Sequence, residues 1–428
     1  MELLSRRSRR GAATGAALES GARLIACAAL GVALCSCASP AVGRSTSLSA
    51  VAPTWTEVAP MIARSCARCH RADGSGPFRL DRAGDWAARR RTIERSLAEG
   101  TMPPPMAESD VELIDAWSVS ATEREVLRAF AASVDRGESG GLALADERRF
   151  DATLGFERGW HLPAIGPMTM RSFCVAIPDA LAGRRVRGFR ARWSEPTAVR
   201  SVSLAPDPRR VSRVMETDLE TPGYEGMGDV GDAPSGALGA CGADGAFELP
   251  IGYAIELPAN GDVIVEMQAQ PVGRAATIVG AIDWRMAEPD CAVVDARVFA
   301  LPPLEFPAQT STTLRASFPL VGGTLVGVMP RAGPLARAIE VSIAYADGRA
   351  PTRVASIADW NPEFRRPVLF ASPLSLPDGA SLEVVVVVDN TSGNPRNPWT
   401  PPRAIGSGVP PTGESVGIMV WTVVEPRS

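Results

Sequence analysis

Apolar residues recur with helical spacing in three segments of the first third of the chain. The segments are residues 55–63, the charged stretch of about 85–99, and residues 120–136. A spacing of three or four residues puts side chains on the same face of a helix. Before the third segment, Ser120 and Glu123 form the capping-box pattern that marks a helix start, and Gly137 ends the segment. We therefore expect three helices between residues 55 and 136.

The pattern becomes that of β-strands after the glycine-rich stretch 137–141. Short runs of Val, Ile, Leu, Phe and Thr are separated by Pro, Gly, Asp and Asn, and long helical stretches are missing. Clear examples are residues 253–257, 263–268 and 384–388. Because the region is long for one sandwich, we expect two β domains that meet near residues 301–307. The predicted fold is multidomain, with a small all-α domain followed by two all-β domains of the jelly-roll or sandwich kind.

The composition excludes several classes of protein. A chain of 428 residues is long enough for several domains, and its 45% apolar and 21% charged residues are ordinary for a globular protein. The formal net charge of -4 gives no basic surface for nucleic acid, so no nucleic-acid partner is expected. Every basic residue is arginine, which we attribute to coding bias rather than to function.

The amino-terminal end has the pattern of an export signal. Arginines at positions 6, 7, 9 and 10 precede an apolar run over residues 24–34 that is too short to span a bilayer. The run ends in Leu34-Cys35-Ser36-Cys37, which resembles the lipobox of bacterial lipoproteins. We predict a lipoprotein signal peptide over 1–36, lipidation of Cys37, and a flexible tether over 37–53. An ordinary signal peptide cut nearby is the alternative. The protein is expected in the bacterial periplasm or at the outer membrane, with a lipid anchor.

The strongest chemical motif is Cys66-Ala67-Arg68-Cys69-His70, which follows the first predicted helix. The spacing is the attachment pattern of c-type haem. Two thiols on one helical face reach the two vinyl groups of a porphyrin, and the histidine ligates the iron. A disulfide or a thioredoxin-like redox pair between Cys66 and Cys69 is the alternative, but both leave His70 without a role. We predict one covalent haem c held by Cys66, Cys69 and His70.

A second axial ligand of the iron is expected from the loop 100–105. Three prolines stiffen this loop, which carries Met102. The thioether of Met102 is the predicted sixth ligand, with Met106 and His161 as rivals, while the alternative role of Met102 is to fill a gap in the packing. Ligation by histidine and methionine suits electron transfer.

Residues 54–137 resemble a class I cytochrome c domain. The resemblance rests on the helix leading into the haem motif, the methionine loop and the final helix. Gly76-Pro77-Phe78 and the later Met102-Pro103-Pro104 are similar to cytochrome domains fused ahead of other modules in bacterial proteins. The resemblance implies one haem, with His70 and Met102 as its axial ligands.

The β region resembles the copper type II, ascorbate-dependent monooxygenases, a family that includes peptidylglycine hydroxylating monooxygenase. Segments similar to its first domain occur in the right order, and residues 389–398 resemble its second domain. These segments are 171–175, 186–189, 249–252 and 263–271. The resemblance implies monooxygenase-like β domains over 150–300 and 301–428.

The copper ligands of that family are missing from this sequence. Val199-Arg200-Ser201-Val202 stands where a histidine pair is expected, and Gln268 stands for a third histidine. In the second domain, residues 330–333 replace a His-x-His pair, and Glu414-Ser415 replaces a Glu-Met pair. The only histidines of the chain are His70 and His161. A histidine-based copper centre needs more imidazoles, so copper is not expected.

The remaining histidine and cysteines have simpler interpretations. His161 is expected in a surface loop. Cys174 and Cys291 flank the first β domain and are predicted to form a disulfide, which leaves Cys241 unpaired. Other pairings among these three cysteines stay open.

Three functions are compatible with these features. The favoured one is an exported monohaem electron carrier that meets a redox partner protein in the periplasm or at the cell surface, with the β region binding a partner or ligand. The second is a haem-fed monooxygenase-type enzyme with atypical or partner-supplied copper. The third is a haem-containing binding or assembly protein. Because the copper ligands are missing, an enzyme is not favoured.

Overall fold

A computed structural model describes residues 52–423 apart from short gaps. The gaps are residues 105, 115–116, 136, 143–149, 156–158, 217–220, 226–234, 244, 302–303, 363–365, 407–413 and 415. Cys37 and the signal peptide lie outside the described residues, so their predicted roles stay predictions. No helix among the described residues has the length and apolar character needed to cross a membrane.

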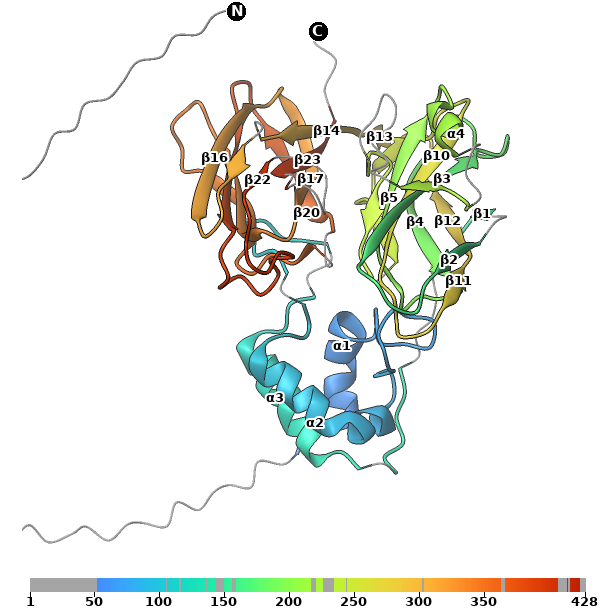
Figure 1. Ribbon diagram of the computed structural model, residues 1–428, viewed down its shortest axis with the longest axis vertical. Coiled ribbons are helices and arrows are strands. Elements are labelled where there is room, and N and C mark those ends of the chain that lie inside the picture. Colours follow the sequence, from blue (N-terminus) through green and yellow to red (C-terminus); the bar gives the residue numbers. More distant parts are fainter. Residues whose placement is uncertain are drawn as a thin grey trace, which may run out of the picture. The chain divides into compact units, whose positions relative to one another are not determined.

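The three predicted helices are confirmed. They are α1 (Trp55–Ser65), α2 (Ala83–Glu99) and α3 (Ala121–Ser133). The capping box forms as expected, because Ser120 accepts from the Glu123 amide and the Glu123 carboxylate accepts from the Ser120 amide. Figure 1 shows the helices gathered against one another. Their shared core includes Phe130, whose ring lies 6.0 Å from that of Trp55 and 5.7 Å from that of Trp86.

A first set of strands follows the helices and forms two larger sheets and one two-stranded pair. One sheet has the order β1-β12-β4-β9-β13, with β8 beside β4, the second has the order β6-β3-β10-β5-β7, and β11 pairs with β2. The bounds are β1 (Ala152–Gly155), β2 (Trp160–Leu162), β3 (Thr169–Ala176), β4 (Arg185–Trp193), β5 (Val199–Asp207), β6 (Tyr224–Glu225), β7 (Ala240–Cys241), β8 (Ala246–Glu248), β9 (Tyr253–Glu256), β10 (Asp262–Ala269), β11 (Ala276–Ile278), β12 (Gly280–Met286) and β13 (Ala292–Val293). The short helix α4 (Val211–Glu216) lies after β5.

A second set of strands forms two four-stranded sheets and a two-stranded pair. Their orders are β14-β23-β17-β20, β16-β21-β18-β19 and β15-β22. The bounds are β14 (Asp295–Ala300), β15 (Glu305–Phe306), β16 (Ser311–Pro319), β17 (Gly323–Ala332), β18 (Ala336–Ala344), β19 (Thr352–Ile357), β20 (Val368–Leu376), β21 (Ser381–Asp389), β22 (Ile405–Gly406) and β23 (Val416–Val423). The second set therefore begins at β14, a few residues before the predicted boundary at 301.

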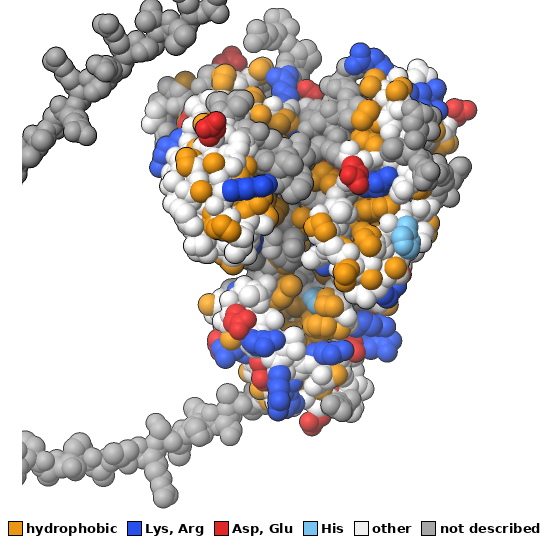
Figure 2. All heavy atoms as spheres, viewed as in Figure 1, with side chains coloured by type: hydrophobic (Ala, Val, Ile, Leu, Met, Phe, Trp, Pro, Cys, Tyr) orange, Lys and Arg blue, Asp and Glu red, His pale blue; other side chains and the backbone are white. Residues whose placement is uncertain are grey.

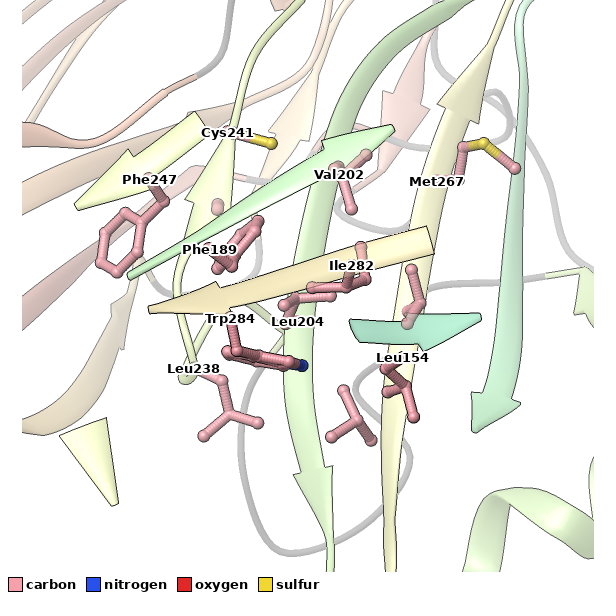
Figure 3. Close-up of a cluster of buried hydrophobic side chains, with 14 of the residues drawn as sticks. Leu154, Phe189, Val202, Leu204, Leu238, Cys241, Phe247, Met267, Ile282 and Trp284 are labelled. Atoms are coloured by element: carbon pink, nitrogen blue, oxygen red, sulfur yellow. The ribbon is translucent and has the colours of Figure 1, made fainter. Parts of the chain in front are cut away.

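The core of the first strand set extends into the second. Figure 3 shows Phe189, Phe247 and Trp284 among the side chains of this core. The same buried cluster includes Met419 and Trp421 of β23, and the rings of Phe247 and Trp421 lie 5.9 Å apart. Aromatic side chains bury large apolar areas, so this shared core ties the two strand sets together.

The helices are likewise joined to the strands. Between α2 and α3 the chain pairs with the second strand set, where Glu108 forms a bridge to Ser356 and Leu113 forms one to Phe370. The Ile114 amide donates to the Leu369 carbonyl at 3.0 Å. A segment that the sequence assigned to the helical domain thus supplies hydrogen bonds to the edges of two sheets.

The predicted fold class is therefore wrong in its division of the chain. Residues Val51–Ser428 form one compact unit that consists mostly of strands, rather than a separate all-α cytochrome domain followed by two separate β domains. The physical reason is that periodicity reports only local structure. Periodicity does not show that the two strand sets share a core. It also does not show that the segment between α2 and α3 pairs with edge strands of two sheets.

A buried carboxyl in the second strand set gives a pH-dependent prediction. Burial raises the pKa of Glu414 to about 7, against an opposing effect of hydrogen bonds from the Leu335 and Gly333 amides. The unfolded chain loses this proton near pH 4.5, so the folded chain holds more protons between about pH 4.5 and 7. The free energy of unfolding is expected to fall as the pH rises through this window, by about 3 kcal/mol in total.

Denaturant unfolding at a series of pH values measures this effect. Glu414→Gln is expected to reduce the fall of the free energy of unfolding with rising pH, because the amide cannot ionise. The matched control is Glu305→Gln, which replaces an exposed carboxyl on β15 and should leave the pH profile unchanged. An identical profile in all three proteins would show that Glu414 does not carry the effect.

Candidate functional site

One cavity beside the helices gathers the residues of the haem motif. Its volume is about 360 Å³, which lies in the range of small-molecule sites. Cys66, Cys69, His70 and Met102 all line it. The apolar part of its wall includes Phe78, Leu80, Trp86, Ile93 and Leu97. Such a lining favours a ligand with a large apolar body.

The two cysteines lie in a turn that directly follows α1 rather than on the helix itself. Cys66 caps the helix, and its amide donates to the Ile62 carbonyl at 2.9 Å. The His70 amide donates in turn to the Cys66 carbonyl at 2.9 Å, which closes a helix-like turn around both thiols. The predicted helical face is thus replaced by a capped turn, but Cys66, Cys69 and His70 still share one cavity.

The His70 ring is held in a defined tautomer. Its Nδ1 lies 2.8 Å from the Phe78 carbonyl oxygen. A carbonyl only accepts, so Nδ1 carries the proton and Nε2 keeps its lone pair for a metal. Burial lowers the pKa of His70, although the hydrogen bond to Phe78 opposes this. A lowered pKa favours the neutral ring, which is the form that can bind a metal.

Two glycines allow the chain to fold back over His70. A Cβ atom on Gly76 would lie 2.6 Å from His70 Nδ1, and one on Gly74 would lie 2.0 Å from the Cys69 carbonyl oxygen. The Gly76 amide donates to that same Cys69 oxygen at 2.8 Å. Any larger side chain at these positions would push the loop away from the imidazole.

The thiol of Cys66 is not prepared for redox chemistry. Burial raises its pKa to about 12, with a further rise from Cys69. Catalytic thiols of the thioredoxin kind have a lowered pKa, because the thiolate is the reactive species. No disulfide joins Cys66 to Cys69. These observations disfavour the redox-pair and disulfide alternatives.

The wall of the cavity contains two buried polar atoms that lack partners among the described residues. Trp117 is 5% exposed, and its indole Nε1 has no acceptor among the described residues. Ser65 is 6% exposed, and its Oγ also lacks a partner in the described part of the chain. Both residues line the cavity. Because a buried polar group without a hydrogen bond is costly, these atoms fit a ligand that has polar groups as well as an apolar body.

The other candidate iron ligands lie elsewhere. Met106 lines a different, much smaller cavity beside Cys241 and Leu369. His161 belongs to β2, where it is exposed and paired with Thr277. His161 was expected in a loop, and its place in a strand corrects that detail.

The predicted disulfide between Cys174 and Cys291 is not formed. Both cysteines are free thiols, with Cys174 on β3 and Cys291 just before β13 in another sheet. Their order along the chain does not determine the distance between two strands in different sheets.

Positions that a copper site would occupy hold other interactions. The Ser201 hydroxyl donates to the Gln268 side-chain oxygen at 2.7 Å, and both side chains are buried. Among the described residues, no group of three or more His, Cys, Asp or Glu could hold a metal ion. The prediction that the chain binds a metal is therefore wrong for an ion held by such a group, because the described residues contain none. A porphyrin differs because it brings most of the iron ligands itself.

The chain was compared with known proteins. No protein-family model matches it, and no curated protein is similar enough to match. Among solved structures, the major capsid protein P2 of bacteriophage PM2 is 12% identical, with 65% of this chain and 98% of that chain covered and a TM-score of 0.26. A chain in the structure of Sulfolobus Turreted Icosahedral Virus is also 12% identical, covering 64% of this chain and 91% of that one, with the same TM-score of 0.26.

These comparisons correct the family assignment. One of the structures named above is a viral major capsid protein and the other is a chain of a virus particle, and neither is described as a cytochrome c or a copper monooxygenase. No family model supports either resemblance. The function that rested on them, an electron-carrying cytochrome with a monooxygenase-like β region, is withdrawn with them. These viral structures do not supply a replacement, because a TM-score of 0.26 establishes neither a shared fold nor a shared role.

The tight contact between Gly76 and His70 gives a stability prediction. Gly76→Ala is expected to lower the free energy of unfolding by about 1–3 kcal/mol, the usual cost of overpacking. The matched control is Gly137→Ala, because a Cβ there meets nothing within 4 Å. The control should change the free energy by less than about 0.5 kcal/mol in denaturant unfolding. Equal losses in the two variants would contradict the contact described here.

Proposed function

We propose that this chain binds one haem covalently in the cavity beside the helices. Cys66 and Cys69 would form thioethers with the porphyrin, and His70 would ligate the iron. The observation that carries the proposal is that two thiols, an imidazole with an available Nε2 and the thioether of Met102 line one largely apolar cavity. The proposal concerns cofactor binding and does not include an electron-carrying role.

The chemistry of the lining supports a haem over a smaller ligand. A porphyrin has a wide apolar body, which matches the walls formed by Phe78, Trp86 and Leu97. It also has acidic groups at one edge, which offer acceptors for a donor such as Trp117 Nε1. Cys66 and Cys69 are both free cysteines and would be available for bond formation with the vinyl groups.

Several residues of the chain would together hold the cofactor. When bound, haem would supply an iron that takes side-chain ligands from the protein. His70 would be one ligand, and the Phe78 carbonyl orients its ring, since it fixes the proton on Nδ1. Met102 is the other proposed ligand. It is 39% exposed and follows the left-handed Gly100 that ends α2. The apolar walls exclude water from the porphyrin faces.

The proposal includes export of the chain and its anchoring through Cys37. Covalent attachment at a Cys-x-x-Cys-His motif follows export, so a signal over residues 1–36 agrees with a haem at Cys66. Lipidation of Cys37 would tether the cavity to a membrane surface. A redox partner protein remains a prediction.

Two matched pairs of cysteine substitutions test the proposal. The full chain is produced with its signal in a bacterium that attaches c-type haem, and its absorption spectrum is recorded after extraction of all non-covalent haem. The parent is expected to retain one haem per chain. Cys66→Ala with Cys69→Ala should lose it, because both thioether positions are gone.

The control pair is Cys174→Ala with Cys291→Ala, which removes two thiols that lie away from the cavity. This variant should retain the haem. A parent without covalent haem would refute the proposal, and so would loss of haem in both pairs of variants.

A further inference from the structure

The first strand set contributes a charged residue to the cavity. Arg200 of β5 lines it, more than a hundred residues along the chain from the haem motif. Figure 2 shows arginine side chains over the outer surface around the helices. Inside the cavity, by contrast, Arg200 is the only Arg, Asp or Glu among the described lining residues. A single cation in a largely apolar cavity selects for a ligand with a negative group.

The neighbours of Arg200 orient its guanidinium without neutralising it. Its Nε donates to the Gln270 side-chain oxygen at 3.1 Å, and its Nη1 donates to the Thr197 carbonyl at 3.1 Å. Both acceptors are uncharged, and no described carboxylate forms an ion pair with Arg200. The Nη2 group has no acceptor in the described part of the chain, so it is available to a ligand.

A hydrogen bond also holds the loop after β7, which pairs with β5, against the cavity wall. The Ser75 hydroxyl donates to the Ala243 carbonyl oxygen at 2.6 Å, and Ser75 is 7% exposed. Ser75 and Ala243 both line the cavity. Arg200 is therefore held near the haem motif by a defined hydrogen bond between the loop after His70 and the loop after β7.

We propose that Arg200 binds a carboxylate of the cofactor, so that the ligand contacts the strands as well as the helices. This inference rests on the proposed haem site and extends it. The guanidinium would form a charge-assisted hydrogen bond, which is stronger than one between neutral groups. Occupancy of the cavity is then linked to the docking of the first strand set onto the helices, because the ligand contacts residues of both.

Reversible binding tests the role of Arg200. In a full-length chain with Cys66→Ala and Cys69→Ala, haem can bind without covalent attachment, and its dissociation constant is measured by optical titration. Adding Arg200→Met is expected to weaken haem binding about tenfold, and Arg200→Lys should restore part of the loss. The dimethyl ester of haem lacks the free carboxylates. Its affinity should therefore be the same whether residue 200 is Arg or Met.

The control is Arg274→Met, which removes an arginine that pairs with Glu195 on the surface and does not line the cavity. It should leave the affinity for haem unchanged. In the Cys66→Ala, Cys69→Ala background, equal affinity for haem with Arg or Met at position 200 would overturn the role of Arg200. Failure of this background with Arg200 intact to bind either porphyrin would instead overturn the proposed haem site.

Discussion

The hydrogen bond from His70 Nδ1 to the Phe78 carbonyl oxygen determines the chemistry of the cavity. It is 2.8 Å long, and it assigns the ring proton to Nδ1. The bond forms only because the loop after His70 turns back sharply, and Gly76 permits this turn since a Cβ there would meet the imidazole. The loop then continues to Leu80, whose amide donates to the His70 carbonyl at 2.9 Å. The imidazole is thereby fixed before any ligand binds.

The cavity also depends on contacts between helices and strands. Trp117, in its wall, contacts two guanidinium groups, those of Arg68 at 5.5 Å and Arg366 at 3.7 Å from the ring. Arg68 belongs to the haem motif, whereas Arg366 lies just before β20 of the second strand set. Cation–π contacts of this kind stabilise a packed aromatic side chain. The lining of the cavity therefore comes from the helical segment and the first strand set, and Arg366 ties one lining residue, Trp117, to the second strand set.

The sequence predicted local structure well, and it singled out residues that the structure places on one cavity. The helix at 121–133 followed from a capping box and an apolar stripe, and the strand at 262–269 followed from a run of Val and Ile. The grouping of Cys66, Cys69 and His70 followed from their spacing. Met102 was placed near them by reasoning about the loop, and the structure puts it on the same cavity.

Other features could not be predicted because they depend on contacts that are distant along the chain. Arg200 was noted only as a replacement for a copper ligand, and nothing in its local sequence links it to residues 66–70. The pairing of Glu108 with Ser356 joins segments about 250 residues apart, so no periodicity reports it. The family resemblances rested on the order of short segments, and the comparisons gave them no support.

The most direct test of the account is the mass of one peptide. The exported chain is digested with a protease, and the fragment that contains Cys66, Cys69 and His70 is analysed by mass spectrometry. The account predicts that this fragment carries the added mass of one haem and that no other cysteine-containing fragment does. Recovery of the fragment at its unmodified mass, from cells that attach haem to other proteins, would contradict the account.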